Sequence, residues 1–167
     1  SEMCIRDRLK SGSSYLSAET DKTSADYGKL VYGSLNTSDL NEVVAGTWKV
    51  STKTTSGAVV YTFVNKVTGM TLAVDPTLAK TATNGLSGDV TLGSGTVSEW
   101  AFDASNHMYS YFKSDSIVFF DNTGALNKGK IADLSAALAV TEDVISTPIP
   151  ISADDLNTLM WSVDSKD

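Results

Sequence analysis

The alternation of hydrophobic and polar positions along the chain predicts short β-strands joined by turns. Residues 58–64 are β-branched and aromatic, and residues 70–75 alternate large apolar side chains with smaller or polar ones. Such residues favour strands, and a period of two turns one face toward a core. Residues 65–69 have turn composition, with Gly69 available for a positive φ. We therefore predict that the two runs form a β-hairpin.

Further short apolar segments, bounded by Gly, Ser, Thr or Asn, predict strands along the rest of the chain. They are residues 29–35, a strand beginning at Trp48, and residues 90–92, 100–102, 108–113 and 116–121. The last two are expected to form a second hairpin, followed by a turn at 122–124. The pattern over 130–138 fits either a helical turn or a strand edge.

Two short amphipathic helices are expected between the strands. In residues 37–44 a Ser/Asp cap precedes apolar side chains at i, i+3 and i+4, and Gly46 ends the pattern. The same capping logic opens a second helix at residues 152–160.

The amino-terminal segments differ from this body. Residues 1–8 resemble a translation of the mosaic-end adaptor used in sequencing libraries, and they hold the only cysteine and both arginines. Our hypothesis is that they are an assembly artefact; the alternative is an ordinary polar terminus. Residues 9–26 are rich in Ser and Thr and are expected to be a polar lead-in. Residues 27–167 then form a single β-rich domain.

Composition limits the possible partners. The 167 residues are 41% hydrophobic and 20% charged, with a net charge of −7, which are ordinary values for one globular domain. An acidic surface repels a phosphate backbone, so no nucleic-acid partner is expected. Apolar runs are only a handful of residues long, so we expect no direct membrane insertion.

A repeated tryptophan pattern is the main clue to architecture. Trp48, Trp100 and Trp161 each begin a short predicted strand and each precede a second core-type residue by two positions. Their spacing of roughly 50–60 residues is typical of a repeated supersecondary unit. Large rings at such positions usually pack inward, so we expect all three in the core. The pattern predicts an all-β fold with a three-unit pseudo-repeat and short helices.

The sequence of the predicted hairpin also resembles that of a known family. The resemblance to the ricin-type β-trefoil lectins covers residues 58–103 and rests on Tyr61-x-Phe63-x-Asn65-x-x-Thr68-Gly69-x-x-Leu72-x-Val74 and on the closing strand at Trp100. It implies a β-trefoil-like barrel; the alternative is a two-sheet β-sandwich. The expected repeat core comprises Trp48, Trp100, Trp161, Tyr61, Phe63 and Leu72.

A second resemblance concerns location. Residues 63–69, 109–113 and 153–157 are similar to segments of the large secreted repeat proteins of gut bacteria, whose domains have no assigned function. This resemblance implies an extracellular or cell-surface module whose partners include other domains of its parent protein.

The residues offer little for catalysis. His107 is the only histidine, so a Ser-His-Asp triad would depend on it, and the usual zinc ligands are lacking. The carboxylates at Asp103, Asp115, Asp121, Asp133 and Glu142 are scattered without a recognisable spacing. We therefore expect no enzyme, no cofactor and no metal site.

Two functions remain open. The first is a structural or adhesive module of a secreted or surface protein. The second is a lectin-like domain that binds carbohydrate or host and cell-surface glycoproteins, because such sites combine an aromatic face with Asp or Asn side chains on loops. The candidate ligand-binding residues are Tyr109, Tyr111, Asp121 and Asn122. Alternatively, the tyrosines are half-buried and the Asp-Asn pair simply makes a turn.

Overall fold

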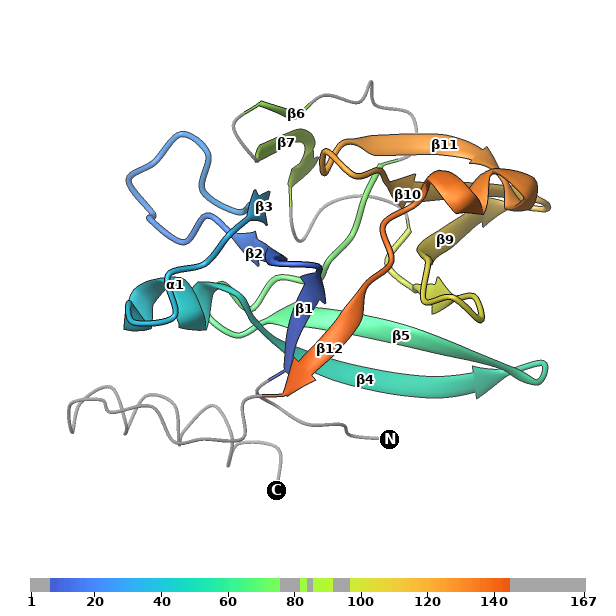
Figure 1. The fold of residues 1–167 in the computed structure, drawn as a ribbon, viewed down its shortest axis with the longest axis horizontal. Helices are drawn as coiled ribbons and strands as arrows, with labels where there is room; N and C mark the ends of the chain where they lie inside the picture. The colour runs from blue at the N-terminus through green and yellow to red at the C-terminus, as the bar shows by residue number, and fades with distance from the viewer. Residues whose placement is uncertain (1–6, 76–81, 84–85, 92–96, 145–167) are drawn as a thin grey trace.

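Antiparallel strands dominate the part of the chain that the computed structural model describes, residues 7–75, 82–83, 86–91 and 97–144 (Figure 1). The strands are β1 (Asp7–Ser11), β2 (Ser14–Ala18), β3 (Lys29–Gly33), β4 (Thr47–Thr55), β5 (Ala58–Asn65), β6 (Ala82–Thr83), β7 (Leu86–Thr91), β8 (Ala101–Phe102), β9 (Met108–Lys113), β10 (Ser116–Phe120), β11 (Leu126–Lys130) and β12 (Thr141–Val144). An α-helix, α1 (Leu40–Ala45), and a 3-10 helix, η1 (Ile131–Ala136), accompany them. The predicted all-β class with short helices is confirmed.

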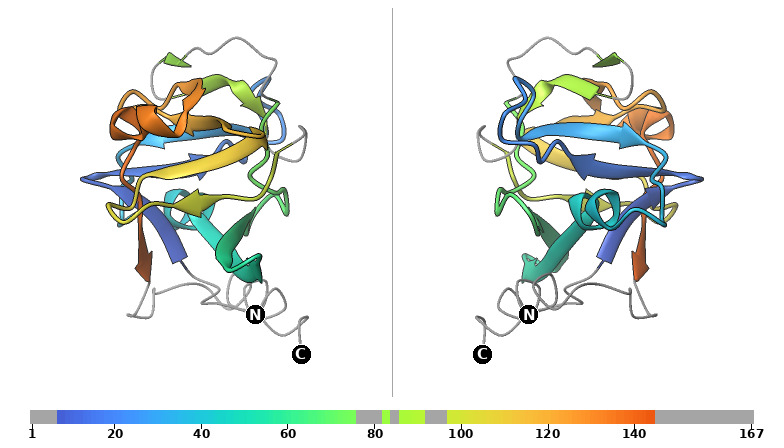
Figure 2. Two further views of the ribbon diagram at one scale, coloured as in Figure 1. Left: turned by 90° about the vertical axis from the view of Figure 1, so that its right-hand side faces the viewer. Right: turned by 90° about the vertical axis from the view of Figure 1, so that its left-hand side faces the viewer.

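These strands form two antiparallel sheets. One has the order β5-β4-β1-β2-β3-β7-β6, with β12 also paired to β1, and the other has the order β11-β10-β9-β8. In Figures 1 and 2, β1, β4, β5 and β12 lie in the lower half of the molecule, and β2, β3, β7, β10 and β11 lie above them.

Backbone pairings connect six segments of the two sheets in a closed circuit. β12 pairs with β1, β1 with β4, β4 with β5, and β8 with β9. An isolated bridge from Tyr61 to Trp100 joins β5 to the residue before β8. A second bridge, from His107 to Ala139, joins the residue before β9 to the segment that leads into β12. The sheets are therefore linked to each other at two places.

The expected polar lead-in is wrong over β1 and β2, which lie inside the larger sheet. Leu9 and Leu16 are fully buried, and Gly12, with a φ of 61°, makes the tight turn between the strands. Leu9 and Leu16 are cross-strand partners, so buried apolar side chains on both strands anchor this Ser-rich segment. The boundary expected after residue 8 falls within β1. Asp7 and Arg8 pair with β4 and β12 through their backbones, which any side chains permit, so the pairing bears on their position and not on their origin.

The main partner of β5 also differs from the prediction. β5 pairs along its whole length with β4, through a two-residue turn at Ser56 and Gly57 with φ values of 51° and 80°. Positive φ at both central residues is the geometry that matches the twist of a hairpin. The expected pairing with residues 70–75 is present only at its base, as a bridge between Val64 and Thr71. The Ser-Gly pair between two β-branched runs was the signal for the longer hairpin.

Asn65 organises the turn that follows β5. Its side chain is fully buried, and its Nδ2 donates a hydrogen bond to the Ala45 carbonyl oxygen at 2.9 Å. Its Oδ1 accepts from the backbone N–H groups of Val67 and Thr68, both at 3.1 Å. Gly69 has a φ of 71°, as the turn composition predicted. One amide therefore joins this turn to the end of α1.

The first predicted helix and its caps are confirmed. The Asp39 side chain accepts a hydrogen bond from the Asn41 N–H at 3.0 Å, which satisfies a free donor at the start of α1. Gly46 is the C-cap residue, and Val43 and Ala45 are buried.

Some of the predictions for residues 90–161 can be compared with the structure, and others lie outside the described residues. The ambiguous segment 130–138 contains the 3-10 helix η1, and the second predicted hairpin is present as β9 and β10. The predicted strand at 90–92 overlaps the end of β7. The second predicted helix, at 152–160, and Trp161 lie outside the described residues.

Two tryptophans occupy similar places in the main core. Trp48, Trp100, Phe63 and Leu72 are all 0% exposed, and Tyr61 packs against them partly buried. The indole Nε1 of Trp48 donates to the Leu16 carbonyl at 2.9 Å, and that of Trp100 donates to the Leu72 carbonyl at 2.9 Å. Each ring therefore satisfies its polar atom while burying its surface.

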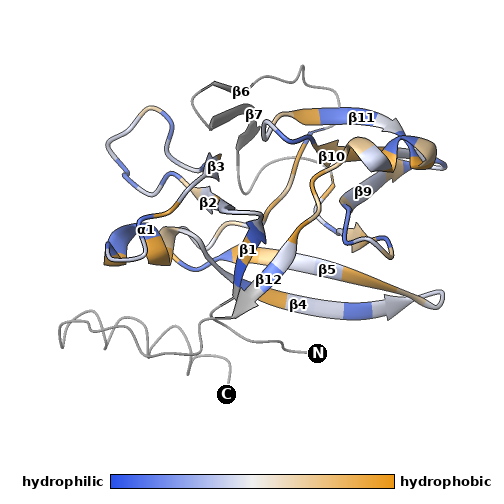
Figure 3. Ribbon diagram, viewed as in Figure 1, coloured by the Kyte–Doolittle hydropathy of each residue, from blue (hydrophilic) through white to orange (hydrophobic). Residues whose placement is uncertain are grey.

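A smaller apolar cluster lies on the other side of β10, whose residues are all buried. Val118 and Phe120 belong to the main core, whereas Ile117 and Phe119 pack with Leu134 and Ala137 from the η1 region. Figure 3 shows the contrast between the apolar β10 and its hydrophilic neighbour β11.

Candidate functional site

The two candidate tyrosines lie together on β9. The ring centroids of Tyr109 and Tyr111 are 5.5 Å apart, with the rings nearly perpendicular. Tyr111 is 50% exposed, whereas Tyr109 packs against the cluster that contains Ile117 and Phe119. Burial, together with the neighbouring Tyr111, raises the pKa of the Tyr109 hydroxyl. Only Tyr111 therefore presents a broad aromatic surface to solvent.

Asp121 uses its carboxylate to shape its own turn. One oxygen, Oδ1, accepts from the N–H and hydroxyl of Thr123, at 2.9 and 2.6 Å, and from the N–H of Ala125 at 3.2 Å. The other oxygen accepts from Nδ2 of Asn127 at 2.6 Å. Partial burial raises the pKa of Asp121, but these hydrogen bonds outweigh it, so the pKa lies below its ordinary value. Asn122 is exposed in the same turn.

This turn also packs against a neighbouring strand. Gly124 has a φ of 82°, and a Cβ added there would lie 2.8 Å from the Cβ of Tyr32 on β3. Because the carboxylate of Asp121 holds a turn that must fit this close contact, we assign it a structural role. The structure thus brings Tyr109 and Tyr111 into contact, whereas the Asp121 carboxylate holds its own turn.

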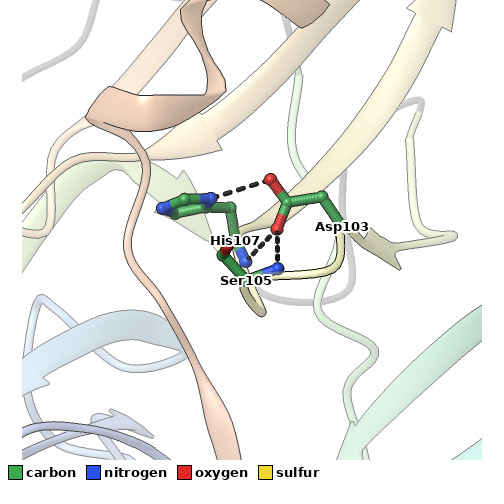
Figure 4. A network of polar contacts seen from close by, with 3 residues as sticks. All are labelled: Asp103, Ser105 and His107. Carbon is green, nitrogen blue, oxygen red and sulfur yellow. Dashed lines mark hydrogen bonds and ion pairs between the residues drawn. The ribbon is translucent and has the colours of Figure 1, made fainter.

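The single histidine belongs to another carboxylate-held turn, between β8 and β9 (Figure 4). Asp103 Oδ1 accepts from the backbone N–H groups of Ser105 and His107, both at 2.9 Å. Its Oδ2 lies 2.8 Å from His107 Nδ1, which must carry the proton because an ionised carboxylate can only accept. Partial burial raises the pKa of Asp103, but the hydrogen bonds from His107 and Ser105 outweigh it and lower the pKa.

The same turn places Asn106 in an uncommon backbone conformation. Asn106 has a φ of 65°, a left-handed conformation that Asn tolerates better than most residues. Its N–H donates to the Asp103 carbonyl at 3.0 Å, and its own carbonyl accepts from the Val140 N–H at 2.9 Å. The Asp103–His107 pair therefore fixes the backbone on both sides of Asn106.

Asn106 lies at a hollow of about 250 Å³ that the sequence did not point to. The lining residues come from β5, β8, the β8–β9 turn and the start of β12: Tyr61, Phe102, Asn106, Val140, Thr141 and Glu142. The rings of Tyr61 and Phe102 are 4.9 Å apart and nearly perpendicular. Since its residues are distant in sequence, no local motif could have identified this hollow.

Within the described residues, no three or more His, Cys, Asp or Glu side chains gather in a way that could hold a metal ion. No helix in the same part of the chain is long and apolar enough to cross a membrane.

The chain matches no family model, and neither the curated proteins nor the solved structures gave a match.

Proposed function

We propose that this chain is a non-catalytic module, structural or adhesive, of a secreted or cell-surface bacterial protein. The observation that carries the proposal is that two carboxylates at or beside the candidate residues serve to hold turns. The carboxylates of Asp103 and Asp121 accept hydrogen bonds on both oxygens from backbone N–H groups and neighbouring side chains within turns, and Asp103 also accepts from Nδ1 of His107. Carboxylates engaged in this way stabilise a fold and are poorly placed to move protons on a substrate.

We propose further that three units form a trefoil-like barrel: the first runs from β1 to β4, the second from β5 to β8, with residues 70–75 as its second segment, and the third from β9 to β12. Two features support this arrangement over two separately packed sheets. The pairings form a closed circuit of six segments, two from each unit. The indoles of Trp48 and Trp100, each at the closing segment of a unit, bind the carbonyl of a buried leucine on the second segment of that unit. In the third unit β12 would take the closing position, so Trp161 comes after it in the chain.

The proposed location rests on the resemblance of residues 63–69, 109–113 and 153–157 to secreted repeat proteins of gut bacteria. An acidic, lysine-containing surface with a net charge of −7 suits a module that must stay dispersed outside the cell.

Antibody labelling of intact cells of the source organism tests the location. Antibodies raised against residues 1–167 are expected to label cells before permeabilisation, while antibodies against a cytosolic protein label them only afterwards. Labelling by both antibodies only after permeabilisation would contradict a surface location.

A hydrolysis screen tests the non-catalytic role. The purified chain is expected to release no product from panels of chromogenic glycosides, esters and peptides. Turnover that is lost in both Asp103→Asn and His107→Gln, with the fold intact by circular dichroism, would replace this proposal with an enzymatic one.

Carbohydrate binding is the second candidate function. It is favoured by the hollow beside Asn106, which combines two aromatic rings with amide, hydroxyl and carboxyl groups.

A further inference from the structure

The distal half of the β4–β5 hairpin forms an arm that reaches into solvent. Residues 53–59 are all exposed, on both strands and at the turn between them. Figure 1 shows this end of the hairpin extending away from β1 and β12. The arm therefore presents its strands where the rest of the fold does not cover them.

One edge of the arm has open hydrogen-bonding groups at Val59. The N–H and C=O of Tyr61 point away from β4, because they bond the Trp100 backbone at 2.7 and 2.8 Å. Backbone groups alternate in direction along a strand, so those of Val59, two residues earlier, also point away from β4. Val59 is 48% exposed, and within the described residues no hydrogen bond occupies its outward N–H or C=O.

This edge lacks the features that block the other sheet edges. Charged side chains and very short strands are common means by which proteins prevent an edge from pairing with another chain. Among the described strands at the borders of the sheets, β11 carries two exposed lysines, β12 carries two adjacent carboxylates, and β6 and β8 have two residues each. Residues 54–65, in contrast, include no charged side chain.

The charge of the chain restricts how two copies can meet. Each copy has a net charge of −7, so two copies repel each other overall. At the base of the arm Lys53 Nζ lies 2.6 Å from Glu99 Oε2, so these two charges balance each other. Contact through the arms therefore brings uncharged surfaces together and keeps the two acidic bodies apart.

We propose that two copies of this chain associate through their β5 edges, paired antiparallel about a twofold axis at Val59. In such a pair the N–H of each Val59 donates to the C=O of its counterpart, so the edge is complementary to itself. The strands β4, β5, β5 and β4 then form one sheet across the two copies. The pairing uses the same edge of both copies, so the association closes at two.

A contact of this size is weak by itself. It joins about three residues of each copy, far less than the roughly 800 Å² per partner of a standard interface. We expect a dissociation constant of about 0.1–1 mM in solution. Copies held close together would bind more firmly, because neighbouring contacts then act in concert. The inference does not depend on the proposed location or the non-catalytic role, so a monomeric chain would leave both standing.

Sedimentation equilibrium of the full chain tests the association, at concentrations from about 20 µM to about 1 mM. We expect the average mass to rise from that of one chain toward that of two. Amide chemical shifts of the ¹⁵N-labelled chain should change with concentration most strongly at residues 57–60. Added salt should strengthen the association, because it screens the repulsion between two negatively charged bodies.

Val59→Lys and Val67→Lys are a matched pair of variants. The two valines are 48% and 47% exposed, and each change adds one positive charge, but Val67 lies in the turn after β5. Val59→Lys places like charges opposite each other across the contact and should weaken the association at least about tenfold. Val67→Lys should associate at least as well as the parent chain, because it lowers the net charge.

Val59→Pro removes the outward N–H and leaves the hydrogen bonds between β4 and β5 in place, as proline does on an edge strand. Loss of both mutual hydrogen bonds should weaken the association about fivefold or more. Circular dichroism shows whether each variant is folded, and Val59→Lys provides the test if the proline is not tolerated.

The possible results are distinct. A mass of one chain at every concentration and salt, or equal association by Val59→Lys and Val67→Lys, would overturn the proposal. Assembly that continues beyond two copies would also overturn it, because a twofold pairing of one edge closes. Concentration-dependent shifts centred on Tyr111 or β11 in place of residues 57–60 would assign the association to another surface, with the same consequence.

Discussion

The amide of Asn65 offers the sharpest test of what holds this fold together. Asn65 is fully buried where the turn after β5 meets the end of α1, and its side chain bonds the Ala45 carbonyl and two backbone N–H groups of the turn. Asn65→Ala removes all three contacts at once and leaves a small void. Asn41→Ala, at an exposed position of α1, is the matched control.

The expected cost follows from the surroundings of each lost partner. A buried carbonyl deprived of its donor costs about 1–3 kcal/mol, whereas each N–H that water can reach costs about 0.5–1.5 kcal/mol at most. Ala45 is buried and Val67 is 47% exposed, so only the first contact carries the larger penalty. We expect Asn65→Ala to lower the free energy of unfolding by about 2–4 kcal/mol, or the melting temperature by about 5–15 °C.

Equilibrium unfolding in urea, followed by tryptophan fluorescence, measures this difference. Asn65→Asp provides a second reading, because it places a carboxylate oxygen against the Ala45 carbonyl in place of the donor. Its deficit should be large at neutral pH and smaller in acid, where a protonated carboxyl can donate again. A loss below about 0.5 kcal/mol for Asn65→Ala, the size expected of a surface change, would refute the reasoning. So would an equal loss in Asn41→Ala.

Three further predictions concern the rings and turns. Trp48→Phe and Trp100→Phe should each lower the free energy of unfolding in urea by about 2–4 kcal/mol, because each leaves a buried carbonyl without its donor and a space in the core. Strongly unequal losses would argue against equivalent roles for the two rings. The pKa of Asp121 lies below its ordinary value of 3.8, so its ionised carboxylate stabilises the fold above that pH and this stabilisation is lost as pH falls through the folded pKa. The stability lost in Asp121→Asn should therefore be larger near neutral pH than in strong acid, and a loss that does not depend on pH would contradict this. Gly57→Ala and Gly124→Ala both strain a positive φ, at about 1–2 kcal/mol, but only the second adds a clash with the β3 tyrosine, so in thermal unfolding it should be the more damaging of the two.

The local pattern of the sequence was enough for elements whose causes are local. The cap at Asp39, the stop at Gly46 and the apolar spacing between them specify α1, because each satisfies or ends the helix within one or two turns of chain. The β9–β10 hairpin and the turn at Asn65–Gly69 were predictable for the same reason. Composition and alternation also sufficed for the all-β class.

Strand partners were harder to predict, because pairing depends on what each strand meets in space. The run at β5 alternates well enough to pair with either neighbour in sequence, and the positive φ values at Ser56 and Gly57 decide for β4. β1 and β2 looked like a polar lead-in because only Leu9 and Leu16 are large and aliphatic. Both leucines become buried because the fold brings distant strands together around them in the main core.

The candidate sites show the same difference between what local sequence predicts and what only the folded chain brings together. The sequence by itself identified Tyr109, Tyr111, Asp121 and Asn122 as aromatic and polar residues near turns, and it showed that His107 stands alone among histidines. The structure shows that the Asp121 carboxylate is used within its own turn, which was the alternative interpretation of the Asp121-Asn122 pair. The hollow beside Asn106 draws its lining from segments far apart in the chain, and the pairings between strands bring them together. Sequence proximity specifies turns and caps, whereas a concave surface exists only once distant strands have closed on one another.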